Sequence, residues 1–446
     1  MSCKSKVLRA SLAALILIGS ATLAAAQVTV IHRFTGVDGY NPVGGLTLDD
    51  QGNLYGATPF GGNADLSGGG TIFRLSPPAD PSRRLWSAKV LHRFPPQAGE
   101  GFPTSGVTFG PSGALYGSLS FSGGLVYRLS PPNTVGQRGY EPIFSFGPAA
   151  SNIGTGLHPN AVIATVGLPG RDVVYGTATE GGVVINGGVL FQLAPQHGQP
   201  TWNETILYNF CSQPIVDQNG NQICSDGANP FAPPTIGPDG NFYGTTLAGG
   251  NGDHGAVYRI EGDGTITILH SFCTNTVCQD GSAPESSLIF DANNSIYGTA
   301  TACSGTTRCH GTVFRLTPQA SDREPFKFSV IHSFCLQVTS SGNCADGALP
   351  RSGLVMDANG ALYGVAEQGG KFGGGVIYKL TPGGNGGYST TVLHSFGAET
   401  SGLPHHPNGT LLLDPNTGIL YGATAFGGNN CGGTNTCGTI FQVIPP

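Results

Sequence analysis

The dipeptide Tyr-Gly recurs seven times along the 446-residue chain. Its tyrosines are Tyr55, Tyr116, Tyr175, Tyr243, Tyr297, Tyr363 and Tyr421, spaced 54 to 68 residues apart. Two further signals recur seven times in the same phase. One is an apolar-aromatic run such as residues 31–34; the other is a glycine followed, three residues on, by an aromatic residue such as Phe73. Such a period indicates repeated structural units, and it overrules the three domains that chain length alone would suggest.

Each unit contains four short apolar runs separated by turn residues, which is typical of β-strands. In the first unit the runs are residues 45–49, 54–58, 71–76 and 89–94. Gly52 lies between the first two runs and can supply the positive φ that a tight hairpin needs. Seven such units predict an all-β fold: a single seven-bladed β-propeller with four-stranded blades. We name the strands of each blade A to D from the axis outward.

The phase of the repeat predicts how the ring closes. Residues 1–26 combine a basic start, an apolar segment and three alanines, which predicts a signal peptide, with the propeller at 27–446. The mature chain then begins with a D-type run at 28–34 and ends with a C-type run at 439–444. We therefore expect the N-terminal strand to complete the last blade, which removes the open sheet edges that favour aggregation.

The composition limits the classes of partner that the protein is expected to bind. The net charge is −6, only 10% of the residues are charged, and Lys and Arg do not cluster, so we expect no nucleic-acid partner. After the leader no apolar run is long enough for a membrane span. We expect a monomer that is secreted or periplasmic after cleavage near Ala26, with no cofactor and no bound metal.

The repeated units read LHSF…DGxxP…GL…D…G-LYG-T…GG…G-T-V-F-x-L-x-P. This pattern resembles the Gloeo/Verruco (GloVer) tandem repeat of choice-of-anchor bacterial proteins, over essentially the whole mature chain. The resemblance implies an exported bacterial protein, but it supplies no agreed activity, so no catalytic residue can be transferred. The chain departs from the family pattern: we expect no anchor at its C-terminus, and its second and third units lack the full Asp-Gly step.

Ten cysteines follow the leader and form five pairs of near neighbours. The pairs are Cys211/Cys224, Cys273/Cys278, Cys303/Cys309, Cys335/Cys344 and Cys431/Cys437. An even count in an exported chain favours disulfides; zinc is the alternative, but no Cys-x-x-Cys spacing occurs. All five pairs fall in D–A or B–C loops, which share one face of a propeller. There they could stiffen a ligand-binding surface or protect long loops from proteolysis.

A carboxylate precedes glycine in the D–A loop of several units: Asp38, Glu100, Asp226, Asp280 and Asp346. One interpretation is a ring of carboxylates that binds a cation or a hydroxyl-rich ligand near the channel mouth. The other, which repetition in register favours, is turn chemistry in which each side chain bonds its own backbone. Histidines recur on the D strands at His32, His92, His270, His332 and His394. We interpret them as packing residues, because Phe144 and Tyr208 occupy the two remaining positions.

Function in a repeat protein is expected where the repeat is broken. Before the Gly-Gly that ends strand B, three blades carry Phe60, Phe121 and Phe426. Blades 3 and 6 carry Glu180 and Glu367 there, and His158 and His405 occur in nearby loops. Two carboxylates and a histidine could act as general acid and base, and the rings could stack on sugars. The alternative for each of these residues is a solvated loop side chain.

Three functions remain open. The first is an extracellular binding module for a glycan or a protein, because the sequence shows no dense catalytic constellation. The second is a carbohydrate-active enzyme, a polysaccharide lyase or hydrolase, with acid and base residues at the channel mouth. The third is a structural component of the cell envelope. The fold does not decide among them; a carboxylate and a histidine in one pocket would favour the enzyme.

Overall fold

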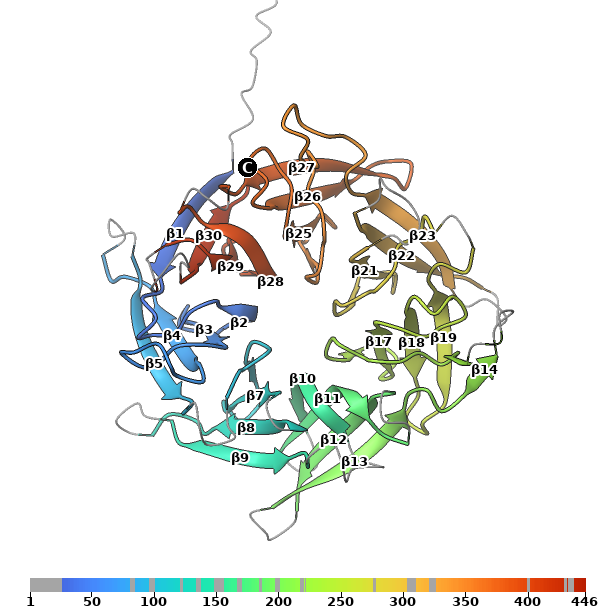
Figure 1. Ribbon diagram of the computed structural model, residues 1–446, viewed down its shortest axis with the longest axis horizontal. Coiled ribbons are helices and arrows are strands. Elements are labelled where there is room, and N and C mark those ends of the chain that lie inside the picture. The colour runs from blue at the N-terminus through green and yellow to red at the C-terminus, as the bar shows by residue number, and fades with distance from the viewer. Residues whose placement is uncertain are drawn as a thin grey trace, which may run out of the picture.

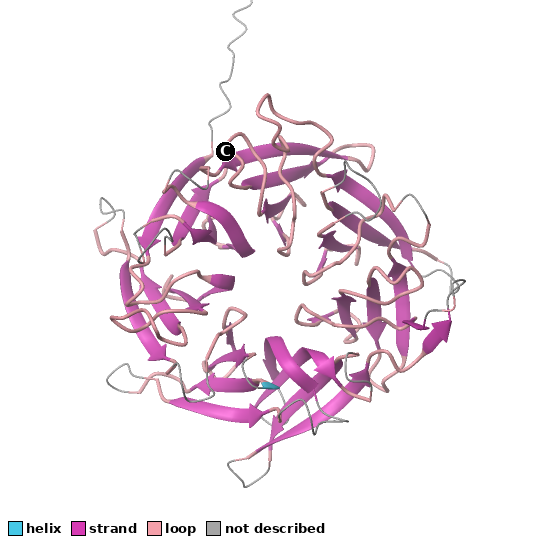
Figure 2. Ribbon diagram, viewed as in Figure 1, coloured by secondary structure: helices cyan, strands magenta, loops and turns pink. Residues whose placement is uncertain are grey.

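Seven four-stranded antiparallel sheets surround a central axis in the computed structural model (Figure 1). The structure describes residues 26–80, 85–95, 101–120, 123–133, 138–147, 156–166, 171–183, 187–196, 201–216, 220, 222–275, 278–302, 310–320, 326–398, 402–428, 431 and 437–446. Strands and loops make up nearly all of this part of the chain (Figure 2). The predicted seven-bladed β-propeller is confirmed. Among the described residues, no helix has the length and apolar character to cross a membrane.

Six blades are each formed by consecutive strands. Blade 1 contains β2 (Val43–Leu48), β3 (Leu54–Thr58), β4 (Thr71–Ser76) and β5 (Ser87–Arg93). Blade 2 contains β6 (Thr108–Phe109), β7 (Leu115–Leu119), β8 (Leu125–Leu129) and β9 (Tyr140–Ser145). Blade 3 contains β10 (Gly156–Val166), β11 (Asp172–Gly181), β12 (Val189–Pro195) and β13 (Trp202–Asn209). A small hairpin, β14 (Pro214–Val216) and β15 (Gln222–Cys224), follows blade 3.

The next three blades repeat this order. Blade 4 contains β16 (Thr235–Ile236), β17 (Phe242–Thr246), β18 (Ala256–Ile260) and β19 (Ile266–Ser271). Blade 5 contains β20 (Ile289–Phe290), β21 (Ile296–Ala300), β22 (Thr312–Pro318) and β23 (Phe326–Ser333). Blade 6 contains β24 (Val355–Met356), β25 (Leu362–Ala366), β26 (Val376–Pro382) and β27 (Tyr388–Ser395).

Blade 7 is completed by the two ends of the propeller chain, as predicted. Its inner strands are β28 (His405–Leu413), β29 (Leu420–Phe426) and β30 (Thr439–Ile444), and β1 (Gln27–Arg33) is the outermost. β1 pairs antiparallel with β30, with Gln27 opposite Ile444. Ile31 and Phe34 are fully buried. The closing strand therefore contributes to the core as well as to the hydrogen-bond ladder.

The Tyr-Gly repeat marks a close contact between strands B and C of each blade. The glycine lies on strand B opposite the aromatic residue of strand C, as Gly56 lies opposite Phe73. A Cβ on Gly56 would lie 2.6 Å from the Phe73 ring, and the corresponding glycine of every blade is similarly crowded by a ring. The tyrosine hydroxyl often donates to the aspartate of the A–B turn, as Tyr55 does to Asp49 at 2.9 Å. The most regular sequence signal therefore encodes packing.

A left-handed residue followed by proline connects each blade to the preceding one. Such a residue with positive φ occurs in all seven blades: Asn41, Phe102, His158, Asn229, Ala283, Leu349 and His406. Its N–H typically donates to a carbonyl of the preceding B–C loop, as Leu349 does to His310 at 2.8 Å. The proline ring then packs on the glycine before the preceding strand C, as Pro350 does on Gly311. These contacts fix the start of strand A near the axis.

Candidate binding site near the central axis

Disulfides mark one face of the propeller. Four of the predicted pairs are bonded, with Cα–Cα distances of 4.4–5.3 Å: Cys211–Cys224, Cys273–Cys278, Cys335–Cys344 and Cys431–Cys437. Cys303 and Cys309 lie outside the described residues. The D–A and B–C loops that carry the disulfides contact each other; in blade 1, Gly62 N–H donates to the Gly36 carbonyl at 2.8 Å. We call the side formed by these two sets of loops the loop face.

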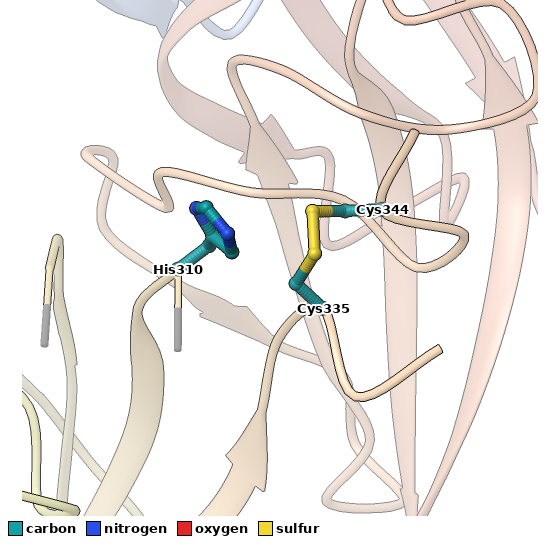
Figure 3. Close-up of side chains that lie close together, drawn as sticks. All are labelled: His310, Cys335 and Cys344. Atoms are coloured by element: carbon teal, nitrogen blue, oxygen red, sulfur yellow. A yellow bond between two sulfur atoms is a disulfide. The ribbon is translucent and has the colours of Figure 1, made fainter. Parts of the chain in front are cut away.

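Two of the disulfides lie beside a further potential metal ligand. His310 lies next to Cys335 and Cys344 (Figure 3), and Asp280 lies next to the other pair, Cys273 and Cys278. In both groups the two sulfurs are bonded to each other. A disulfide sulfur is not a thiolate, which is the form that binds metals. The close approach of these cysteines is therefore explained by disulfide bonds and does not indicate a metal site.

The carboxylates that precede glycine are held by their own loops. Asp38, Asp226, Asp280 and Asp346 each accept a hydrogen bond from a backbone N–H of the same D–A loop. Asp226 is only 1% exposed and also accepts from the Tyr208 hydroxyl at 2.7 Å. Glu100 lies outside the described residues. The oxygens of the four described carboxylates thus face donors of the protein itself.

Three of these carboxylates pair with D-strand histidines. The nitrogen–oxygen distances are 2.9–3.0 Å in His32–Asp38, His270–Asp280 and His332–Asp346. Burial of Asp280 opposes its ionisation, but hydrogen bonds from His270 and from backbone N–H groups hold its pKa below the usual value. In the sequence the histidines and carboxylates form two separate repeated patterns; in the structure six of these residues form three pairs between D strands and D–A loops.

Glu180 and His158 come together in blade 3. Leu157, next to His158, pairs with Glu180 across β10 and β11. The Nδ1 atom of His158 lies 3.4 Å from Oε2 of Glu180, and the two side chains are 36% and 40% exposed. Blade 3 and blade 6 lie on opposite sides of the axis (Figure 1). The structure therefore joins a carboxylate to a histidine but does not join Glu180 to Glu367.

His405 and Phe426 contact each other in blade 7. Their rings stack with centroids 5.4 Å apart, and His405 is only 6% exposed. The Nδ1 atom of His405 lies 2.8 Å from the Leu403 carbonyl oxygen. This histidine is therefore enclosed by the ring and the backbone beside it.

Phe60 belongs to an aromatic cluster between blades 1 and 2. It stacks on Tyr40 at 5.3 Å and meets Phe102 edge-on at 5.5 Å. All three rings are half-buried, so part of each is open to solvent on the loop face. Phe121, the corresponding residue of blade 2, lies outside the described residues.

A polar group around Arg351 spans blades 5 and 6. Arg351 Nη1 lies 3.2 Å from a carboxylate oxygen of Glu285, and its Nε lies 2.9 Å from Oε2 of Glu367. The Arg351 side chain is 49% exposed, whereas that of Glu285 is 15% exposed. Burial raises the pKa of Glu285, although the charge of Arg351 opposes that effect. One guanidinium thus forms ion pairs with two carboxylates. The group therefore has a net charge of −1 when both carboxylates are ionised.

A pocket of about 180 Å³ adjoins this group at the seam between blades 6 and 7. Arg351, Ser352 and Glu367 line it from blade 6, together with Asn408 from blade 7. These four side chains offer a guanidinium, a hydroxyl, a carboxylate and an amide. The pocket therefore presents hydrogen-bond donors and acceptors side by side, as polar binding sites do.

Glu367 was predicted from the sequence as a site residue, whereas Glu285 and Arg351 were not. Both residues directly follow the proline that connects the blade to the preceding one, and the residue type at this position varies from blade to blade. The series is Val43, Thr104, Asn160, Phe231, Glu285, Arg351 and Asn408. Alignment of the seven units on this proline would have shown the variation. Only the folded ring brings Glu285 of one blade to Arg351 of the next.

Comparisons with known proteins find a family-model match to part of the chain and distant similarities to solved structures. No curated protein matches the sequence. Three solved structures are similar at 12% identity: one described as an oxidoreductase (glucose dehydrogenase) from Thermus thermophilus, one described as a 6-phosphogluconolactonase from Bacteroides uniformis, and a protein of unknown function from Dyadobacter fermentans. Their TM-scores are 0.39, 0.44 and 0.41. The matches cover 76%, 78% and 95% of this chain, and 95%, 83% and 100% of the other chains. At TM-scores this low, the activities of these proteins do not indicate the function of this chain. Residues 175–349 match the model of the Gloeobacter/Verrucomicrobia repeat.

Proposed function

We propose that the protein is an extracellular binding module that holds a glycan at the Arg351 group. The observation that carries this proposal is the contact of Arg351 with both Glu285 and Glu367, beside the pocket that Ser352 and Asn408 line. A sugar hydroxyl both donates and accepts hydrogen bonds, so neighbouring hydroxyls can bond a carboxylate and a guanidinium at once. A flat apolar ligand would desolvate these groups without forming hydrogen bonds to them, which costs binding free energy.

The disulfides support an extracellular or periplasmic location. Four are formed among the described residues, and structural disulfides persist in oxidising compartments. A glycan is a ligand that such a compartment supplies. The proposal extends to the periplasm as well as to the exterior of the cell.

The rigidity of the site supports binding. Arg351 follows Pro350, whose ring packs on Gly311 of the preceding blade, and Glu367 directly follows β25. The Glu367 N–H donates to the Leu349 carbonyl at 3.1 Å. Groups that are fixed before the ligand arrives lose little conformational entropy on binding.

The aromatic cluster of Tyr40, Phe60 and Phe102 offers a second contact on the loop face. It lies between blades 1 and 2, and blade 7 separates it from the pocket beside Arg351. Partly exposed rings can pack on the apolar faces of sugar rings. A glycan of several residues could therefore reach from the Arg351 group toward this cluster, which favours an oligosaccharide over a single sugar.

The test is a polysaccharide panel with purified protein of residues 27–446. Retention on each polysaccharide and the release of new reducing or unsaturated ends are measured in the same wells. We expect retention on at least one polysaccharide without product. The variants Glu285→Gln and Glu367→Gln should each weaken retention by about ten- to a hundredfold, because each removes a charged acceptor worth about 1.5–3 kcal/mol.

Glu261→Gln is the matched control. Glu261 also pairs with an arginine, Arg259 at 2.7 Å, but it follows strand C and so belongs to the opposite face. This control should bind like the wild type. Equal retention by Glu285→Gln, Glu367→Gln and the control, or no retention on any polysaccharide, would contradict the proposal.

An enzyme is the second candidate, and the contact of His158 with Glu180 favours it. The Nδ1–Oε2 distance is 3.4 Å and both side chains are open to solvent, so a substrate could reach them. Product formation in the same panel that is abolished by Glu180→Gln would support a lyase or hydrolase. Glu141→Gln is the control for this variant, because Glu141 pairs with Arg128 on the outer strands of blade 2. Product formation that both variants retain would exclude Glu180 from the chemistry.

A further inference from the structure

The D strand of each blade carries one residue that faces the D strand of the preceding blade. In blade 2 this residue is Tyr140, which stacks on His92 at 4.0 Å with an interplanar angle of 12°. In blade 5 it is Phe328, which stacks on His270 at 3.6 Å with an angle of 6°. The two positions correspond, because each lies opposite the same leucine of strand C: Tyr140 opposite Leu129, and Phe328 opposite Leu316.

Each of these rings lies in a cage of three rings. Around Phe328 the cage consists of His270 on its face, Phe272 edge-on at 5.8 Å and Phe314 at 5.6 Å. Around Tyr140, the corresponding three residues are His92, Phe94 and Tyr127. The same cage therefore takes an aromatic side chain at two junctions of the propeller.

The junction of blades 6 and 7 has the cage but carries an aliphatic residue at the central position. His394 meets Phe396 at 4.8 Å, and Phe396 meets Phe441 at 5.3 Å. The position held by Tyr140 and Phe328 elsewhere is held here by Val28, opposite Val443. Valine is too short to stack on His394 as a ring does.

A pocket of about 430 Å³ opens at this junction. It is lined by the three cage residues, by Val28 and Val30, and by Phe372 and Leu403 at its rim. The rim residues are 50% and 57% exposed. Burial lowers the pKa of His394, so its imidazole is neutral at pH 7 and suits an apolar guest.

We propose that this pocket, the aromatic socket, binds a small planar aromatic compound of one or two rings stacked on His394. The chain itself places a ring in the same cage at two other junctions, so the cage geometry suits such a guest. The volume lies within the range of small-molecule sites, roughly 300–1,000 Å³. The lining is mainly apolar, and His394 and Ser395 are its polar side chains, which also suits an aromatic ligand. This site is separate from the Arg351 group and does not depend on glycan binding.

The junction of blades 7 and 1 supplies a matched comparison. There the central position is Ala88, opposite Leu75, and a pocket of about 260 Å³ opens beside His32. Charged residues contribute to its lining: Asp38, Lys89 and Arg93. Its small central residue resembles that of the aromatic socket, but its chemistry does not favour an uncharged ring.

The test measures binding of 2-naphthol to the protein of residues 27–446 by isothermal titration calorimetry. Val28→Phe places a ring in the socket as blade 5 does with Phe328, and should weaken binding at least about tenfold. Its thermal midpoint should be equal to or above that of the wild type, because the ring fills a cavity. Ala88→Phe makes a comparable change at the neighbouring junction and should leave the affinity unchanged.

A second variant and a saturated ligand test the aromatic socket independently of Val28→Phe. Phe328→Ala vacates the cage of blade 5 and should raise the number of 2-naphthol sites by one. Saturated decahydro-2-naphthol should bind several-fold more weakly, because it cannot stack on the imidazole. Equal binding by wild type and Val28→Phe, or equal binding of the two compounds, would overturn the proposal. Binding of tryptophan-containing peptides without binding of 2-naphthol would assign the socket to a polypeptide partner instead.

Discussion

The Nε2 atom of His270 lies 2.9 Å from Oδ2 of Asp280, and this contact joins the last strand of blade 4 to the loop that leads into blade 5. The same carboxylate accepts from the Cys273 N–H at 3.2 Å, beside the Cys273–Cys278 disulfide. One side chain therefore fixes the D strand and the D–A loop relative to each other. The equivalent pairs at His32–Asp38 and His332–Asp346 repeat this arrangement.

Asp280→Asn should destabilise the protein by about 1–3 kcal/mol at pH 7, because the charged acceptor of a partly buried hydrogen bond is lost. The pKa of Asp280 is lowered in the folded state: burial opposes ionisation, and the bonds from His270 and the backbone outweigh it. A lowered carboxylate pKa contributes stability above the unfolded pKa of about 3.9 and loses it as the pH falls through the folded pKa. The difference between wild type and variant in urea unfolding should therefore shrink below about pH 4.

Asp263→Asn is the control for this prediction. Asp263 also has a lowered pKa, through hydrogen bonds from Thr265, but it lies in an exposed turn. Its substitution should change the unfolding midpoint little at any pH. Equal losses in Asp263→Asn and Asp280→Asn would show that the His270 contact has no special role.

His92→Phe should make the protein more resistant to mild acid. Burial lowers the pKa of His92 to about 4. The unfolded chain, with a histidine pKa near 6.5, then binds a proton before the folded protein does, so stability falls as the pH drops from about 6.5 to 4. Phenylalanine removes this loss and keeps a ring against Tyr140; Phe144 occupies the same position in blade 2. Thermal midpoints from pH 7 to 4 should decline less steeply in the variant, and parallel curves would contradict the assignment.

Gly298→Ala should destabilise the protein by about 1–3 kcal/mol through overpacking. A Cβ on Gly298 would lie 2.5 Å from the Phe314 ring and 2.8 Å from Leu288. Gly387→Ala is the matched control, because a Cβ there meets nothing within 4 Å. Urea midpoints of the two variants measure the effect. A loss of similar size in both would mean that the Tyr-Gly repeat is not explained by the ring contact.

Ile31→Ala should cost about 2–5 kcal/mol, the range for a buried aliphatic residue cut back to alanine. Ile31 is fully buried in β1, the strand that closes blade 7. Ile444→Ala, on the partner strand β30, should cost far less because Ile444 is 45% exposed. Urea unfolding followed by tryptophan fluorescence gives both values. A small loss in Ile31→Ala would show that the closing strand contributes little to the stability of the ring.

The fold was predictable because every blade repeats the same local signals. The Tyr-Gly pair, the strand C aromatic residue and the D-strand aromatic residue each satisfy contacts within one blade or with the next blade, so sequence periodicity reports them directly. The bonded cysteine pairs were predictable for the same reason: the partners are 5 to 13 residues apart. The signal peptide stays a prediction, since residues 1–25 lie outside the described part of the chain.

The candidate site was only partly predictable, because its contacts join different strands and, for Glu285 and Arg351, different blades. Glu367 differs from the residues at its position in most other repeats, so the sequence pointed to it. Glu285 and Arg351 are 66 residues apart, and they contact each other only because blades 5 and 6 are neighbours in the ring. The contact of His158 with Glu180 likewise depends on the pairing of β10 with β11. Single-residue exceptions in a sequence do not reveal which of them share a pocket.

The sequence by itself determined the number of blades, the strand exchange between the ends of the chain and the four disulfides among the described residues, since these follow from local patterns repeated in order. Only the tertiary structure decided which side chains meet at the junctions between blades. At those junctions a single change of size, such as Val28 in place of Phe328, turns a packed ring into a pocket. Such a change leaves the strand pattern intact, because a strand position accepts either residue, and its consequence depends on the neighbouring blade that the folded ring brings against it.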